Sequence, residues 1–286
     1  MGWVNVFRVR QLRWALVAML SCGLLPAWGA INVIAHYSLG EADSGAANNA
    51  VVASGTQPTT GATTLPVIGA PQYSNAGAPQ PRPSRLSVQF NGSTDGFRAP
   101  SVLTTASDNF GIEAWVRASS TAGSSQVVYN GDSSTSGGGI FRNGAYWGFL
   151  YGGQTLELTA TPSVDLNTWT HLALVVSGGT STLYKNGVAV HTYAGPPAVP
   201  DGAFSIGVGA TSNGEFFAGN VDEVRVFTFA AGEFMTSDLL SGLAYTDPVA
   251  APVVAPVAVP VNAPVWLLAM ALALFAVGAA AVRSRR

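Results

Sequence analysis

The stretch Asn167–Tyr193 restricts the fold of this chain more than any other part of the sequence. Trp169–Val176 is apolar and β-branched, has no helical period, and is followed by a Ser-Gly-Gly turn. Thr182–Lys185 and Val188–His191 then flank Asn186-Gly187, and Asn-Gly supplies the two residues of positive φ that a type I′ turn requires. The stretch therefore predicts three consecutive antiparallel strands.

The rest of the central region repeats this pattern of short strands and turns. Leu86, Val88 and Phe90 alternate with polar residues and are expected to face a core. In Phe110–Arg117 the apolar residues occupy one face, which leaves Trp115 on the other and suggests that this second face is not simply solvent-exposed. About twelve short strands without a long helical pattern predict an all-β fold of two packed antiparallel sheets.

One internal segment departs from the pattern. Residues 46–84 are rich in Ala, Gly, Pro, Thr and Ser and show little periodicity. We expect a long surface excursion with one short strand near residues 65–68. At the other end of the central region, residues 235–243 are expected to form a short helix or turn against the sheets.

Charge argues against a nucleic-acid partner. Only 10% of the residues are charged, and six of the 13 basic residues lie at the two termini. Between the termini, seven basic residues face 15 acidic ones, a net charge of −8. Such a surface repels phosphate backbones, whereas its carboxylates are suited to a hard cation.

The N-terminus has the pattern of an export signal. Basic residues precede an apolar run, Trp14–Leu25, which is followed by small residues. This predicts a secretory signal peptide over residues 1–29, cleaved after Gly29. An uncleaved membrane anchor is the alternative, although the run is short for a full span. The single cysteine, Cys22, is expected to leave with the signal, so the mature protein is predicted to have no disulfide.

The C-terminus has the pattern of a membrane anchor. Residues 246–264 contain prolines at every fourth position and predict a stiff, extended spacer. Residues 265–282 form an uninterrupted apolar run that is long enough to span a bilayer. The basic tail 283–286 is expected to remain in the cytoplasm, which places the central domain outside the inner membrane.

Five sequence blocks, in order, resemble the bacterial laminin-G-like, concanavalin A-like lectin family. They run over residues 37–41, 86–95, 111–116, 167–171 with the hairpin 183–187, and 218–227. The resemblance implies a jelly-roll sandwich over residues 31–245 and a lectin-like module, often with bound Ca²⁺. Because this fold hosts many functions, the resemblance predicts the fold more strongly than the activity.

The end of the chain resembles bacterial C-terminal sorting signals of the PEP or IPTL kind, which exosortase-type proteases process. The stretch Val259–Trp266 approaches the IPTL pattern but lacks the usual Thr-Leu-Ser after the proline. The resemblance implies release to the cell surface, whereas the length and charge of the segment alone imply an anchor that is retained.

The family resemblance also implies three calcium ligands. The matching positions are Glu41 after the first strand, Asp95 in an Asn-Gly-Ser-Thr-Asp turn, and Asp222 before the last strand. The alternative is that each carboxylate caps a turn or pairs with an arginine.

The sequence carries no pattern typical of catalysis. Some relatives of this architecture hydrolyse glycosides with two carboxylates close together. Here Asp222 and Glu223 are adjacent and would point to opposite faces of a strand. His171 and His191 are isolated from each other, and the sequence has no nucleophile elbow, zinc-type histidine spacing or phosphate loop. We therefore expect no enzyme.

A binding function would use exposed aromatic and polar side chains. The candidate ligand-binding residues are Trp115, Tyr129, Arg142 and Trp147, because aromatic rings stack on sugars and also anchor protein interfaces. The alternative is that these rings pack between the sheets.

The expectation for the whole chain is an exported, membrane-anchored or surface-sorted binding module. Its predicted ligand is a carbohydrate, with calcium as a cofactor. The second hypothesis is a structural or adhesive protein whose partner is an extracellular protein, and the third is a degraded hydrolase.

Overall fold

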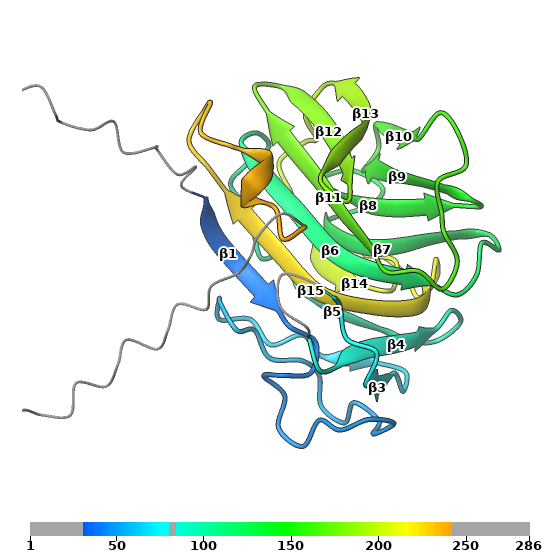
Figure 1. The fold of residues 1–286 in the computed structure, drawn as a ribbon. Coiled ribbons are helices and arrows are strands. Elements are labelled where there is room, and N and C mark those ends of the chain that lie inside the picture. The colour runs from blue at the N-terminus through cyan, green and yellow to red at the C-terminus, as the bar shows by residue number, and fades with distance from the viewer. Residues whose placement is uncertain (1–30, 80–83, 242–286) are drawn as a thin grey trace, which may run out of the picture. The chain divides into compact units, whose positions relative to one another are not determined.

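The computed structural model describes residues 31–79 and 84–241, which form two antiparallel sheets packed face to face (Figure 1). This confirms the predicted all-β jelly-roll sandwich. The larger sheet has eight strands in the order β13-β12-β11-β6-β15-β4-β3, with β1 also paired to β15. Its strands are β1 (Asn32–Tyr37), β3 (Gln72–Ser74), β4 (Ser87–Asn91), β6 (Phe110–Ala118), β11 (Thr170–Ser177), β12 (Thr180–Lys185), β13 (Val188–Ala194) and β15 (Ala218–Thr228).

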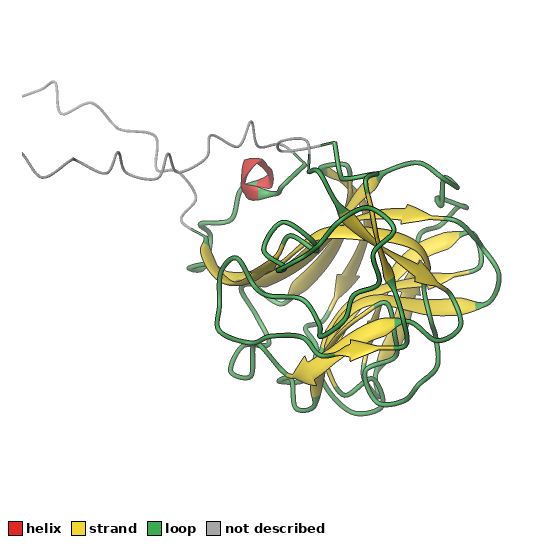
Figure 2. Cartoon of the chain, turned by 90° about the horizontal axis from the view of Figure 1, so that it is seen from below, coloured by secondary structure: helices red, strands yellow, loops and turns green. Residues whose placement is uncertain are grey.

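The smaller sheet has seven strands in the order β10-β9-β8-β7-β14-β5-β2. Figure 2 shows the strands from below, with the loops around them. The strands of this sheet are β2 (Val67–Ile68), β5 (Gly96–Pro100), β7 (Ser124–Gly131), β8 (Gly138–Asn143), β9 (Tyr146–Tyr151), β10 (Thr155–Leu158) and β14 (Ala203–Ile206).

The main core lies between the two sheets. Alternation along β6 buries Ile112, Ala114 and Val116 in it, together with Val88 and Phe90 from β4, as predicted. The side chains between these residues point to the opposite face of the larger sheet, which we call its outer face. Fully burying an aliphatic or aromatic side chain stabilises a fold by about 1.5–3 kcal/mol, so this alternation fixes which face is inner.

The predicted hairpin is confirmed. Asn186 has φ +52° and Gly187 φ +78°, and these two residues join β12 to β13. The turn before β12 uses the same conformation at Gly178 and Gly179, with φ +58° and +73°. Asn186 also accepts a hydrogen bond from the His171 N–H at 2.8 Å, which ties the turn to β11.

The described part of the segment 46–84, residues 46–79 and Ser84, contains more strand than predicted. It contains β2 and also β3, which the prediction of a single strand missed. Residues 49–52 run along β3, where the N–H groups of Asn49 and Val52 donate to the carbonyls of Tyr73 and Pro71. Composition could not show this, because the segment is ordered by pairing with residues distant in sequence.

Strand β15 changes partner at a β-bulge. Ala218–Val221 pair with β4, whereas Val224–Thr228 pair with β1. The register along β6 shifts between Asp222 and Arg225, and Glu223 has φ +49°. The Glu223 carboxylate lies 2.6 Å from His36 Nε2 and so links the bulge to β1.

The segment after β15 covers half of the outer face of the larger sheet. We call residues 229–241 the strap; it contains a single 3-10 turn, Thr236–Asp238, as expected (Figure 2). Phe229 and Leu239 of the strap are buried against Ala173, Val175 and Phe227, which point outward from the sheet. This second apolar cluster is separate from the main core.

A buried ionic cluster also attaches the strap to the sheet. Glu113 is completely buried and accepts hydrogen bonds from Arg225, from His171 at 2.8 Å and from the Leu240 N–H at 3.0 Å. Arg225 donates in turn to the Asp238 carbonyl. Burial raises the pKa of Glu113, but the charge of Arg225 and the hydrogen bond and charge of His171 outweigh it, so the pKa lies below its usual value.

Several sequence-based predictions concern residues that the structure does not describe. They are the signal peptide 1–29, the spacer 246–264, the membrane helix 265–282 and the tail 283–286. Within residues 31–79 and 84–241, no helix has the length and apolar character needed to cross a membrane.

Candidate ligand site on the larger sheet

All four predicted ligand-binding residues are buried: Trp115, Tyr129, Arg142 and Trp147. Trp147 belongs to the main core. The Tyr129 hydroxyl donates to the Ser136 carbonyl at 3.0 Å, and burial raises the pKa of this tyrosine. The prediction that these rings form an exposed binding surface is therefore wrong. The rings of Tyr129 and Trp147 lie in the interior, where aromatic side chains contribute the most buried area.

Arg142 has a structural role. Its guanidinium donates to the carbonyls of Ala122, Gly123 and Gly144 at 2.9, 3.2 and 2.9 Å, and to Ser125 Oγ at 3.1 Å. These bonds hold two turns at one end of the smaller sheet. Burial lowers its pKa, and the four acceptors occupy most of the N–H donors that a ligand would otherwise use.

Trp115 lies on the outer face, as predicted, but only 6% of it is exposed. Its ring packs edge-on against His171, with the ring centroids 5.4 Å apart. Its ring therefore lies next to the Glu113 cluster, through His171, and is too buried to present a face to a ligand.

The three predicted calcium ligands each hold a loop. The Asp95 carboxylate accepts from the N–H groups of Asn91 and Ala70, at 3.1 and 3.0 Å, and from the hydroxyl of Thr94 at 3.0 Å. Glu41 accepts from the N–H groups of Arg85 and Leu86 and from the Ser84 hydroxyl. Both carboxylates are caps, the alternative that the sequence analysis left open.

Asp222 is completely buried and accepts from the N–H groups of Ala78 and Glu223, both at 2.8 Å. Burial and the charge of Glu223 raise its pKa well above the usual range. Asp222 lies near the Ser87 end of β4, and Asp95 follows its other end, about 13 Å away along the strand.

The predicted ligand set is therefore not assembled. Within the described ranges, no three His, Cys, Asp or Glu side chains come together in a way that could hold a metal ion. Calcium needs six to eight oxygen ligands, whereas the oxygens of Glu41, Asp95 and Asp222 accept hydrogen bonds from amides and hydroxyls. These residues, as placed, do not fit a calcium site.

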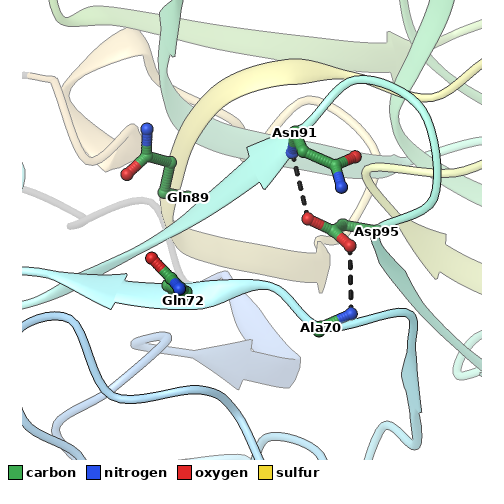
Figure 3. A pocket seen from close by; sticks show the side chains of 5 residues that line it. All are labelled: Ala70, Gln72, Gln89, Asn91 and Asp95. Carbon is green, nitrogen blue, oxygen red and sulfur yellow. Dashed lines mark hydrogen bonds between the residues drawn. The ribbon is translucent and has the colours of Figure 1, made fainter.

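An open polar pocket lies where β3 and β4 meet the β4–β5 turn (Figure 3). It encloses about 270 Å³ and is lined by Ala70, Gln72, Gln89, Asn91 and Asp95. Gln72 and Gln89 are exposed and directly opposite each other on paired strands, so their amides project from the same face. Figure 3 shows Asp95 between the backbones of Asn91 and Ala70 at the end of the pocket.

Hydrogen bonds within the β4–β5 turn and to Ala70 hold the end of the pocket in a fixed shape. Asp95 joins the β4–β5 turn to Ala70, and the Asn91 side chain accepts from the N–H groups of Ser93 and Thr94. Gly69 has φ +73°, and a Cβ there would lie 2.5 Å from the Asp95 carboxylate, so this position requires glycine. Two exposed primary amides on a fixed frame can donate to and accept from hydroxyl groups.

A second pocket, of about 160 Å³, has Asp43 in its wall. The Asp43 carboxylate accepts from the Gln57 N–H at 2.6 Å, from the Thr56 hydroxyl at 3.2 Å and from the Tyr73 hydroxyl at 2.9 Å. Burial raises the pKa of Tyr73, and the charge of Asp43 adds to this shift. These bonds fasten the segment that lies along β3, so we assign this pocket a structural role.

The sequence does not indicate that Gln72 belongs to a site. For Gln89 it predicts the face of the sheet but not the neighbour. The alternation of residues 85–90 puts Gln89 on the outer face. Its pairing with Gln72, which lies 17 positions earlier in the chain, is a matter of register and appears only in the folded sheet.

Comparison with known families agrees with this fold. Residues 91–233, half of the chain, match the Laminin_G_3 model, described as the concanavalin A-like lectin/glucanases superfamily. The chain belongs to this superfamily. No curated protein sequence matches it.

Two solved structures are similar to this chain at low sequence identity. A sialidase from Trypanosoma rangeli, in complex with 2,3-difluorosialic acid, is 18% identical with a TM-score of 0.50; the match covers 75% of this chain and 34% of the sialidase. Domain 4 of AbnA, a GH43 extracellular arabinanase from Geobacillus stearothermophilus in complex with arabinotriose, is 19% identical with a TM-score of 0.47. That match covers 73% of this chain and 98% of the arabinanase domain. At this identity the likeness concerns the fold alone.

Proposed function

We propose that this domain is a non-catalytic carbohydrate-binding module and that the pocket between β3 and β4 is its ligand site. The observation that carries the proposal is the pair of exposed, opposed amides of Gln72 and Gln89 on a fold whose superfamily groups lectins with glucanases. Sugars present closely spaced hydroxyls, which both donate and accept. A primary amide matches them in both respects, and two amides side by side fix the orientation of a ring.

We propose a non-catalytic module because of the residues that line this pocket. Its one carboxylate, Asp95, accepts three hydrogen bonds from the protein. Hydrolysis by the usual route needs two carboxyl groups on either side of the glycosidic bond. The pocket supplies only one carboxyl group, and the oxygens of that group already accept hydrogen bonds from the protein.

The cellular setting remains the one predicted from the termini. We propose that the domain is exported and then held at the inner membrane by residues 265–282, or released at the cell surface if a sorting protease removes them. A mass spectrum of the mature protein distinguishes the two, because only the anchored form keeps Arg286.

A glycan array with the purified protein, with and without calcium, tests the proposed function. We expect binding to a subset of glycans that does not depend on calcium. Replacing one amide in Gln89→Ala is expected to weaken binding about fivefold to tenfold, the usual effect of losing one hydrogen bond. The matched control is Gln154→Ala, an exposed glutamine in the β9–β10 turn of the other sheet. Equal binding by both variants would exclude the pocket.

A structural or adhesive role is the second candidate, and the edge strand β13 favours it. Among the described residues only β12 pairs with β13, and Val188 and Val190 are 65% and 37% exposed. Uncharged, exposed edge strands are templates for pairing with another chain. This role would be favoured if the protein bound no glycan but was captured by an extracellular protein partner. Val190→Lys should then abolish that capture.

A further inference from the structure

The two amides of the pocket begin a longer polar row that crosses the larger sheet. Strand register places Gln72 opposite Gln89, Gln89 opposite Asn220, and Asn220 opposite Arg117. Directly opposed residues in antiparallel strands point to the same face. The four side chains therefore form one line across β3, β4, β15 and β6.

This line runs over the outer face. Val88, Val116 and Val221, the sequence neighbours of these residues, are buried in the core between the sheets. The polar row is therefore directed away from the core. Gln72 and Gln89 are exposed and Arg117 is half-buried, whereas Asn220 is 5% exposed and forms the floor between its longer neighbours.

Each end of the row is apolar. Val51 bridges to Gln72 from the far side of β3 and is 50% exposed. At the opposite end, Thr170 pairs with Val116, so the preceding residue, Trp169, continues the row beyond Arg117. Trp169 is half-buried, and the Arg117 Nε donates to the Asn167 carbonyl at 2.9 Å, which holds the guanidinium beside the loop that carries the tryptophan.

The dimensions and chemistry of the row indicate its occupant. From Gln72 to Trp169 the row takes four strand-to-strand steps, about 19 Å in all, which one sugar ring cannot span. Amides suit hydroxyl groups, and an aromatic ring at the end suits the apolar face of a sugar. The region between the termini has a net charge of −8, which disfavours a polyanionic chain.

We propose that Gln72, Gln89, Arg117 and Trp169, over the floor formed by Asn220, are successive contacts for one linear, neutral oligosaccharide that lies across the strands. This deepens the proposed function and rests on it. The pocket binds one end of the chain, and Arg117 and Trp169 bind units further along. The ligand is then a polysaccharide segment rather than a terminal sugar.

Isothermal titration calorimetry with cello-, xylo- and manno-oligosaccharides, each from disaccharide to hexasaccharide, tests this inference on the purified protein. For the series that binds, we expect affinity to rise with chain length until the row is filled and then to stay constant. Gln89→Ala is expected to weaken every length about fivefold to tenfold. Trp169→Ala is expected to weaken only the longer chains, by a similar factor.

Two controls separate folding from binding. Trp169→Ala is expected to keep the wild-type affinity for the disaccharide, so a loss confined to long chains cannot be assigned to misfolding. Trp169→Phe keeps an aromatic face and is expected to recover most of the affinity for long chains. Tyr146→Ala removes a half-buried ring on β9 of the other sheet and is expected to leave binding unchanged.

The outcomes distinguish the inference from the proposed function. If Gln89→Ala weakens binding but affinity does not depend on length and Trp169→Ala has no effect, the pocket is a site for a single sugar and the extended row is wrong. If no oligosaccharide of any length binds and the array is also negative, the proposed function fails together with the inference.

Discussion

The two halves of the outer face of the larger sheet differ in what covers them. Over β11, β12 and the end of β15, the sheet presents Ala173, Val175 and Phe227, and the strap buries them. Over β3 and β4 it presents the amides of Gln72 and Gln89, which stay exposed. Both halves belong to one continuous sheet, so backbone pairing does not explain the difference.

The difference follows from the side chains that alternate with the core. Burial of apolar residues that point outward stabilises the fold by about 25 cal/mol per Å², so these residues favour a covering segment. Hydroxyl and amide groups gain little free energy from burial. The covered half therefore contributes to stability and the open half is available to a ligand. Substitutions in the two halves should separate stability from binding.

The largest effect on stability is expected at the Glu113 cluster. Glu113→Ala leaves Arg225 and His171 buried without their acceptor, and removal of one partner of a buried ion pair costs about 3–5 kcal/mol. Urea denaturation measures the loss in unfolding free energy. The control is Glu157→Ala, whose pair with the partly exposed His191 is expected to contribute less than about 1 kcal/mol. Equal losses would show that the cluster does not hold the covered half.

The strap itself is the next target. Phe229→Ala opens a cavity against Phe227 and Leu239, and we expect the free energy of unfolding to fall by about 3 kcal/mol. Glycan binding at the far half should be unchanged, as titration of the folded variant will show. A variant that keeps its stability but loses binding would reverse the roles of the two halves.

A pH titration tests the buried carboxylate at the bulge. The pKa of Asp222 is raised in the folded state, so between its unfolded and folded pKa values the folded protein holds a proton that the unfolded chain has released. In that window stability falls as pH rises. Asp222→Asn keeps an oxygen for the Ala78 N–H and carries no charge, so its stability relative to wild type should increase from acidic to neutral pH. Asp165→Asn, at an exposed carboxylate, is the control. A parallel pH profile for Asp222→Asn and wild type would contradict the assignment.

The open half should tolerate substitution. Gln72→Ala and Gln89→Ala remove exposed side chains and are expected to change the unfolding free energy by less than about 0.5 kcal/mol. Denaturation of these variants beside Phe229→Ala measures the contrast directly. A loss comparable to that of Phe229→Ala would mean that the amides are structural and would remove the reason for calling this half a ligand site.

The smallest expected effect is that of calcium. Because the carboxylates of Glu41, Asp95 and Asp222 accept hydrogen bonds from the protein itself, the melting temperature should be the same in calcium and in chelator. A clear rise with calcium would show a site built from other oxygens and would restore the prediction drawn from the family resemblance.

Much of the fold could be predicted from local sequence. The Asn186-Gly187 turn adopts the positive φ values that these residues allow, and the alternation in β6 places Trp115 outward. The site could be predicted only in part. The chemistry of Trp147 and Arg142 suits a binding surface, but burial depends on which face packs against the second sheet, and residue type alone does not show this.

The sequence by itself determined that the chain forms strands, where most of them turn, and that its acidic centre is flanked by basic termini. These properties are local, since they depend on alternation, turn residues and the count of charges. The tertiary structure decided that Gln72 lies beside Gln89, that Asp95 and Asp222 are far apart, and that the strap covers one half of a face. Each of these depends on register and packing between residues distant in sequence, and a slip of one residue in β3 or β4 would turn Gln72 or Gln89 to the other face.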